Sequence, residues 1–220
     1  IKGNENVSIG TNANVGSATD KLEANKTVAI GSGTKASANN AIAIGTDAKA
    51  ESLQQVSIGT SAGANRAGDA ADVLNKYGTS VGYEAGRSVK GQSNVSYGFR
   101  SGSDIDGDFN ISIGMLSGKR SEADTDRRAV SKTISIGGLS YAANGEGNIA
   151  IGHLAWATAE NATAIGWGAK ATTANGIALG KNSETETVHT GDYTLNANYV
   201  AAGTPRDDHG TVSVGNQTRK

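Results

Sequence analysis

Cysteine is absent from the 220 residues, proline occurs once, and aromatic residues make up only 5% of the chain. Without cysteine there is no disulfide framework and no thiol chemistry. With so few aromatic residues, a globular core built on leucine and phenylalanine is not expected. No run of 18 apolar residues predicts a membrane-spanning helix. The net charge of −1 gives no electrostatic footprint for nucleic acid.

Glycine is the residue that the chain has in excess, with 31 of 220 positions, roughly twice the usual frequency of about 7%. This composition suits many short strands that are joined by tight bends and packed through small side chains. The chain begins at Ile1 and carries no signal-peptide pattern. We therefore expect a domain excised from a longer mature protein.

A short block that ends in glycine recurs along the chain, with typical copies NVSIG, AIAIG, NISIG and GIALG. A 14-residue step separates neighbouring copies between Gly31 and Gly59 and between Gly152 and Gly180, and the steps elsewhere are longer. Self-similarity at such a period predicts stacked repeats. The twelve glycines are Gly10, Gly31, Gly45, Gly59, Gly82, Gly98, Gly114, Gly137, Gly152, Gly166, Gly180 and Gly215.

The positions one and three residues before the glycine are apolar in nearly every copy, with Thr79, Tyr97 and Thr163 as exceptions. They share one face of a strand, because side chains alternate between faces with a period of two. We predict that this row is the core of the repeat. Its members are Val7, Ile9, Val28, Ile30, Ile42, Ile44, Val56, Ile58, Ile111, Ile113, Ile134, Ile136, Ile149, Ile151, Ile177 and Leu179.

Two further positions of the repeat are always small. The residue between the two apolar ones is serine or alanine in all twelve copies, and the residue three after the glycine is alanine, serine or threonine. A half-exposed strand would more often carry lysine, glutamate or threonine there. The restriction predicts close packing on the second face as well, and we expect a neighbouring subunit to make that contact.

The repeat predicts an all-β fold, a parallel β-solenoid in which each 14-residue unit is one coil of two short strands and two turns. Stacked coils pair through backbone hydrogen bonds at about 4.8 Å per coil. Two apolar residues per coil bury too little surface to offset the ordering of about 14 residues. We therefore expect a homo-oligomer with cyclic symmetry.

The pattern N-x-[VI]-[SA]-[IV]-G-x-x-A at this spacing resembles the head repeat of trimeric autotransporter adhesins of the YadA-like type. The resemblance covers residues 1–183 and implies a left-handed parallel β-roll assembled as a homotrimer. Residues 209–220, HGTVSVGNQTRK, resemble the start of that family's neck. Residues 184–220 are therefore expected to form a connector and the beginning of a neck that leads to a coiled-coil stalk.

The resemblance implies a non-enzymatic adhesin at the cell surface, anchored in the outer membrane by a C-terminal barrel that these residues do not include. Its expected work is multivalent attachment to host extracellular-matrix proteins, with collagen-type ligands, or autoagglutination between cells. Immunoglobulin binding is the alternative within the family. A β-solenoid polysaccharide-active enzyme and a phage tail-fibre segment are the alternatives outside it.

No catalytic, cofactor or metal site is expected. The three histidines are scattered, without the spacing of metal ligands. The sequence DIDGD at 104–108 has its glycine in the wrong place for an EF-hand, and a solvated turn is the better interpretation. No group of residues offers a nucleophile with a base and an orienting partner.

The sequence does not identify ligand-binding residues, but four side chains are candidates. Trp156 and Trp167 are expected near adjacent coil corners, where they would contact a ligand or cap the groove between subunits. Arg127 and Arg128, with Lys119 and Arg120 nearby, would contact an acidic partner or form a solvated loop. They belong to an insertion at 115–133 that we expect to protrude, like a second insertion at 66–78.

Overall fold

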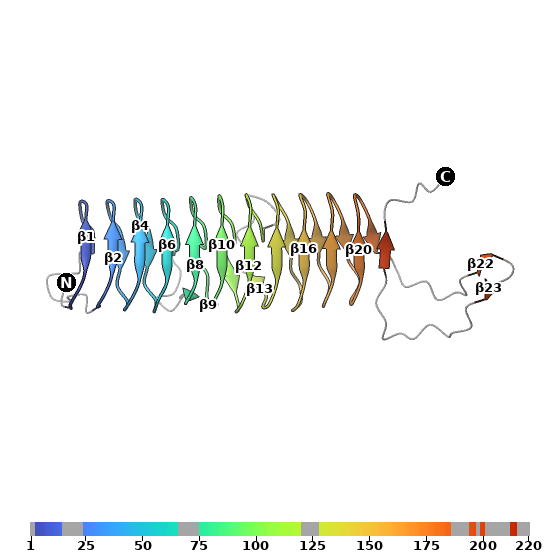
Figure 1. Cartoon of the computed structure of the whole chain (residues 1–220), viewed down its shortest axis with the longest axis horizontal. Helices are drawn as coiled ribbons and strands as arrows, with labels where there is room; N and C mark the ends of the chain where they lie inside the picture. The colour runs from blue at the N-terminus through green and yellow to red at the C-terminus, as the bar shows by residue number, and fades with distance from the viewer. Residues whose placement is uncertain are drawn as a thin grey trace.

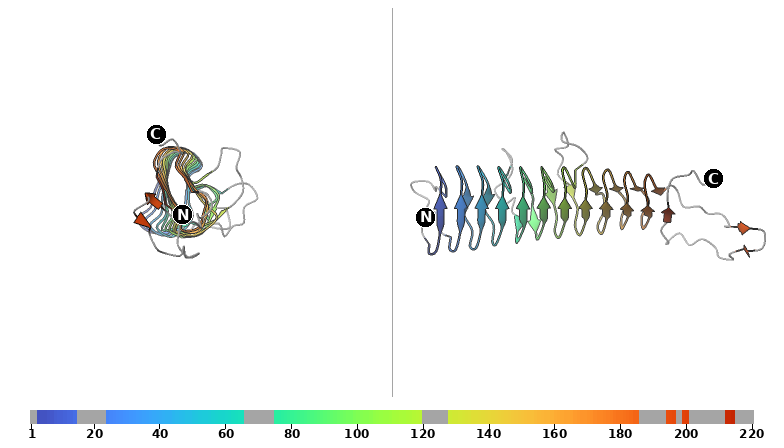
Figure 2. Two further views of the ribbon diagram at one scale, coloured as in Figure 1. Left: turned by 90° about the vertical axis from the view of Figure 1, so that its right-hand side faces the viewer. Right: turned by 45° about the horizontal axis from the view of Figure 1, so that its top comes forward.

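A computed structural model describes residues 3–14, 24–65, 75–119 and 128–185, together with short strands at 194–196, 199–200 and 212–214. These residues form strands and turns, and no helix occurs among them. The coils stack into a rod in which the strands lie side by side across the long axis (Figure 1). Viewed along that axis, successive coils superimpose (Figure 2). The fold is therefore a parallel β-solenoid, as predicted.

One parallel sheet of twelve three-residue strands runs along the rod. In spatial order the strands are β1 (Val7–Ile9), β2 (Val28–Ile30), β4 (Ile42–Ile44), β6 (Val56–Ile58), β8 (Thr79–Val81), β10 (Val95–Tyr97), β12 (Ile111–Ile113), β14 (Ile134–Ile136), β16 (Ile149–Ile151), β18 (Thr163–Ile165), β20 (Ile177–Leu179) and β24 (Val212–Val214). Each strand is the apolar–small–apolar part of one glycine-ended block. Equivalent block positions pair with one another, so the sequence repeat is also the register of the sheet.

The length of a coil varies along the rod. Ile42 pairs with Val56 and Ile149 pairs with Thr163, each at the interval of the predicted repeat unit. Ile111, in contrast, pairs with Ile134, which follows at a much longer interval. A uniform coil length therefore describes parts of the solenoid near its two ends, and the coils between them are longer.

The second side of the solenoid consists of two-residue strands in shorter parallel sheets. They are β3 (Lys35–Ala36) with β5 (Lys49–Ala50), β7 (Asn75–Lys76) with β9 (Gly91–Gln92), β11 (Ile105–Asp106) with β13 (Arg128–Ala129), and the four-stranded set β15 (Tyr141–Ala142), β17 (Trp156–Ala157), β19 (Lys170–Ala171) and β21 (Glu184–Thr185). Beyond them, β22 (Thr194–Asn196) and β23 (Tyr199–Val200) pair antiparallel, whereas β24 continues the long sheet next to β20.

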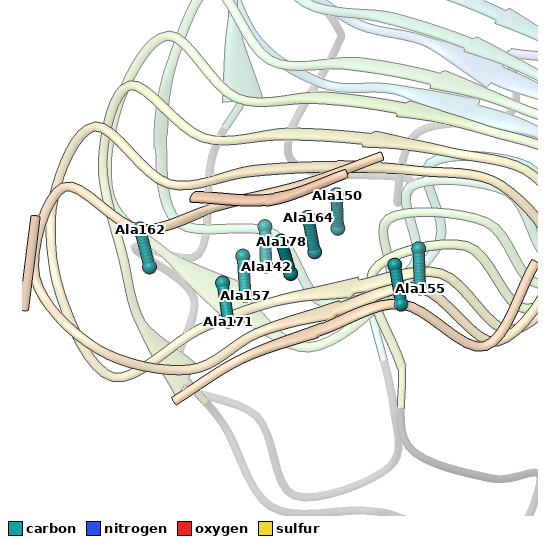
Figure 3. Packing of buried hydrophobic residues seen from close by; sticks show 9 residues of the cluster. Ala142, Ala150, Ala155, Ala157, Ala162, Ala164, Ala171 and Ala178 are labelled. Atoms are coloured by element: carbon teal, nitrogen blue, oxygen red, sulfur yellow. The ribbon is translucent and has the colours of Figure 1, made fainter. Parts of the chain in front are cut away.

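The serine and alanine row of the long sheet lies inside the coil. Ala43 and Ala164 are completely buried within the single chain. In Figure 3 the methyl groups of Ala150, Ala164 and Ala178 project into the same interior as those of the facing strands. The prediction that this row contacts a neighbouring subunit is therefore wrong, because the chain's own second side already covers it.

The large apolar residues lie outside the coil, so their assignment as the core of the repeat is also wrong. None of the sixteen is buried in the single chain, and Ile9 is 57% exposed. The two sides of the coil are joined through alanine and serine, which leaves no room for isoleucine between them. The residues corrected in this way are Val7, Ile9, Val28, Ile30, Ile42, Ile44, Val56, Ile58, Ile111, Ile113, Ile134, Ile136, Ile149, Ile151, Ile177 and Leu179.

The glycines at the ends of the blocks form a column along the rod. Gly45 has a φ of 122°, a conformation that side chains with a Cβ rarely adopt. A Cβ at Gly45 would also lie only 2.7 Å from the carbonyl carbon of Gly59 in the next coil. The bend and the close stacking of coils both require glycine at this position.

Candidate interaction surface

An uncharged apolar surface extends along the long sheet from β1 to β20. It consists of the residues one and three before each glycine, and we call it the apolar face. Its members are the sixteen residues named above together with Thr79, Val81, Val95, Tyr97, Thr163 and Ile165. Because these positions contain no charged side chain, the face has the charge depletion that is typical of the centre of a protein interface.

Three large side chains lie at the corner that follows the apolar face in consecutive coils. Tyr83, Phe99 and Met115 each come directly after a block glycine, and all three are exposed. The rings of Tyr83 and Phe99 are stacked, with centroids 5.3 Å apart and planes 11° from parallel. We call Tyr83 and Phe99 the aromatic corner, and Met115 lies beside it in the next coil. The sequence signal for it is the large residue after the glycine in three successive copies, in place of the Thr or Ser of the first four.

An ion-pair cluster fixes the aromatic corner from one side. Arg100 Nε donates a hydrogen bond to Glu84 Oε2 at 2.7 Å, and Arg87 Nη1 lies 3.0 Å from Glu84 Oε1. The guanidinium of Arg100 lies 5.3 Å from the centroid of the Phe99 ring. Burial alone would raise the pKa of Glu84, but the hydrogen bond from Arg100 and the charges of Arg87 and Arg100 outweigh it, so the pKa is lowered.

Trp167 is an exposed side chain at the equivalent corner near the other end of the rod. Half of its surface is open to solvent. Its ring stacks against His153, with centroids 6.4 Å apart, and Lys181 Nζ lies 5.2 Å from the ring centroid. Of the two predicted tryptophans, Trp167 is therefore the more accessible to an external molecule.

Trp156 has different surroundings, on the second side of the solenoid. It is half-buried against a cluster that contains Val89, Ile105 and Val130, and it meets the ring of Tyr141 edge-on at 6.3 Å. Its role in the single chain is to pack against its neighbours. The two tryptophans thus do not form one aromatic patch.

The basic residues that were predicted as candidates also differ in their surroundings. Lys119 is buried and forms an ion pair with Asp104, 3.0 Å from Nζ to Oδ2, so the interpretation of Lys119 as part of a solvated loop is wrong. Arg128 Nη2 donates to the carbonyl oxygen of Ser103 at 2.9 Å. Arg127 lies outside the described residues, as do Arg120 and most of the two insertions, at 66–74 and 120–127.

Metal sites and membrane-spanning helices are both missing from the described residues. Nowhere in the described ranges do three or more histidine, aspartate or glutamate side chains gather in a way that could hold a metal ion. Nor does that part of the chain contain a helix long and apolar enough to cross a membrane. The apolar face and the corners beside it are the candidate surfaces that the described coils present.

These features define the chain as a parallel β-solenoid with a narrow interior of small residues and an apolar outer face. Three of its segments, residues 23–48, 143–169 and 157–183, match the family model described as YadA head domain repeat. These segments are YadA head domain repeats, which confirms the resemblance noted in the sequence. No curated protein matches the chain. The matches lie among the shortest coils, and the longer coils between residues 49 and 142 lie outside them.

Proposed function

We propose that this chain is the head of a trimeric adhesin that acts at the bacterial cell surface without catalysis. The observation that carries the proposal is the match of three segments to the YadA head domain repeat, two at one end of the rod and one at the other. In this proposal residues 1–183 are a left-handed head. Residues 184–220 are a connector and the start of a neck that leads to a coiled-coil stalk.

The apolar face is the surface through which the three copies would associate. The eleven strands from β1 to β20, stacked about 4.8 Å apart and each about 10 Å long, give a face of roughly 530 Å² per subunit. Stable interfaces take about 800 Å² from each partner, and the corners beside the face can supply the remainder. Association would also cover side chains that are costly to leave in water, such as Ile9 and Leu179.

Adhesion by such a head would depend on multivalency. A stiff rod with identical surfaces in three copies raises avidity without requiring a strong single contact. The proposed ligands are extracellular-matrix proteins of the collagen type, or a second head on a neighbouring cell. Immunoglobulin is the alternative ligand within the same family.

Binding of the purified head to immobilised collagen, to immunoglobulin and to a head-coated surface tests the proposal. The natural chain is expected to sediment as a trimer and to bind one of these surfaces. The double variant Ile44→Glu, Ile136→Glu places charges on the apolar face and is expected to give a folded monomer. Loss of avidity should weaken its apparent affinity by about 10²–10⁴-fold.

Lys170→Glu is the matched control, because it changes a charge on the exposed outer side of β19 and not on the apolar face. It should leave both trimerisation and binding unchanged. A natural chain that sediments as a monomer, or a monomeric variant that binds as tightly as the natural chain, would contradict the proposal.

A polysaccharide turnover assay separates the adhesin from the enzymatic alternative. Two of the buried or half-buried carboxylates in the described coils are already held by cations, Glu84 by two arginines and Asp104 by Lys119. We therefore expect no turnover. Activity that disappears when one acidic pair is replaced would instead support a β-solenoid hydrolase or lyase.

A further inference from the structure

The apolar face repeats so regularly that it does not by itself specify how far one copy is displaced along another. Ile134 and Ile136 pair with Ile149 and Ile151 in the next coil. A copy that slips by one coil, about 4.8 Å, therefore places isoleucine where isoleucine had been. Strand register is weakly specified when neighbouring positions are equivalent. Assembly through this face alone would allow staggered trimers.

Tyr97 interrupts the repeat on the apolar face. It occupies the position directly before the glycine, where its partners in the coils on either side are Val81 and Ile113. At 58% exposed, its side chain is the most open of the large apolar residues in the described chain. Its size and exposure make the coil of β10 different from the coils above and below it.

The surroundings of Tyr97 are firmly held. Phe99, two residues further on, stacks on Tyr83, and Arg100 covers both rings while bound to Glu84. A ring that projects from a rigid support keeps its position when a partner docks, whereas a ring on a pliable support would adapt to several partners. Tyr97 thus acts as a fixed projection at one height of the rod.

We propose that Tyr97 determines the axial register in which copies of this chain assemble, and this inference rests on the proposed trimer. In a symmetric trimer all three Tyr97 rings lie at one height. A slip by one coil would press each displaced ring against a position sized for Val81 or Ile113 of the neighbouring copy. Overpacking of that kind disfavours the staggered states.

The only methionine in the chain provides the test. Met115 is unique and exposed, and it lies two residues beyond Ile113, in the coil next to that of Tyr97. The methyl group of Met115 is labelled with ¹³C in the assembled chain, with the initiator methionine removed. A threefold-symmetric trimer gives one methyl signal, whereas a staggered trimer contains inequivalent copies and gives up to three. The natural chain should show one signal and Tyr97→Ile should show several.

Three control variants separate register from other effects. Tyr97→Phe keeps the ring and should retain the single signal. Tyr77→Phe alters an exposed tyrosine that is not on the apolar face and should also retain it. The double variant Tyr97→Ile, Ile113→Tyr moves the ring by one coil in every copy and should restore a single signal.

Sedimentation distinguishes the ways in which the inference can fail. A trimeric Tyr97→Ile chain with a single methyl signal overturns the role of Tyr97 and leaves the trimer standing. A natural chain that sediments as a monomer overturns the proposed assembly itself. If the double variant keeps several signals, the heterogeneity does not come from a missing ring, and the inference also fails.

Discussion

The coils near the two ends of the rod and the coils in its middle share one sheet but differ on the other side. In the coils that pair residues 28–58 and 149–179, which we call the thin coils, the buried apolar side chains are all alanine, and small polar ones such as Ser57 are buried beside them. Between them, the longer coils contain a buried cluster of larger side chains, with Val89, Ile105, Val130 and Tyr141. The long sheet and its apolar face continue through both kinds of coil. The repeat therefore constrains one side of the solenoid, and the second side is free to gain residues.

One kind of hydrogen bond is common to the two regions. In the longer coils a ladder of buried amides joins successive turns, because Asn94 Oδ1 accepts from the backbone N–H of Asn110 at 3.0 Å and Asn110 Oδ1 accepts from that of Thr133 at 3.0 Å. These side chains satisfy backbone donors at turns that would otherwise be buried without partners. In the shorter coils, Asn148 Oδ1 accepts from the backbone N–H of Ala162 at 3.0 Å in the same way, so this contact does not depend on the length of the coil.

The largest expected effect concerns the thin coils. Ala164→Arg forces a long charged side chain into an interior sized for methyl groups, and we expect it to cost more than about 4 kcal/mol and to abolish cooperative folding of the coils around it. Lys170→Arg is the control, since Lys170 is exposed on β19 and lies outside the apolar face, and an arginine there should leave the β-sheet circular dichroism intact. Urea unfolding, monitored by circular dichroism, measures the stability of both variants. Equal stability of the Ala164→Arg variant and the natural chain would contradict the inward orientation of Ala164.

The buried ion pair of the longer coils should show the next largest effect. Lys119→Met removes the cation beside the buried Asp104 carboxylate and is expected to cost about 3–5 kcal/mol in unfolding free energy. Adding Asp104→Leu should recover much of this loss. In the thin coils, the exposed pair of Lys170 with Glu184 provides the comparison, and Lys170→Met should cost less than about 1 kcal/mol. Similar losses of unfolding free energy in the two lysine variants would mean that the ion pairs of the two regions contribute equally to stability.

The smallest expected effect depends on pH. Because the pKa of Glu84 is lowered in the folded chain, its contribution to stability is present at neutral pH and is lost as the pH falls through that lowered pKa. Glu84→Gln should reduce the unfolding free energy by about 1 kcal/mol at neutral pH, and its difference from the natural chain should shrink in acid. Urea titrations of both chains at neutral and acidic pH measure this. A difference that grows in acid would show that the ion pairs with Arg87 and Arg100 do not lower the pKa.

The glycine-ended block predicted the strands, the bends and the parallel register, because one repeated pattern determines all three. It did not reveal which face points inward. Large apolar residues usually form the core and small ones tolerate exposure, but a coil whose walls meet through Ala43 and Ala164 reverses that expectation. The distance between the two sides of the coil determines which face points inward, and the sequence of a single block does not reveal that distance.

The longer coils were less predictable for a different reason. Val89 and Ile105 each follow their block glycine by the same interval, but Val130 lies much further from Gly114, so no single period identifies the three residues as a cluster. The buried position of Lys119 depends on Asp104 in the preceding coil, and a lysine in a polar segment ordinarily indicates solvent. Among the residues of the candidate surface, Tyr97 could be recognised in the sequence as a departure from the repeat. Its exposure and the stacked rings beside it could be found only in the structure.

The glycine column has a consequence for the gene that encodes the rod. From Gly10 to Gly180, each coil meets the next through the same glycine-on-glycine contact, so coils are interchangeable at their junctions. An in-frame deletion of codons 157–170 would join Trp156 to Ala171, the residue that pairs with Ala157 in the intact chain. The shortened protein would stack Gly152 directly on Gly180 and keep the neighbouring strands in register. Unequal recombination between repeats can therefore change the length of the rod in steps of about 4.8 Å, with no need for compensating substitutions.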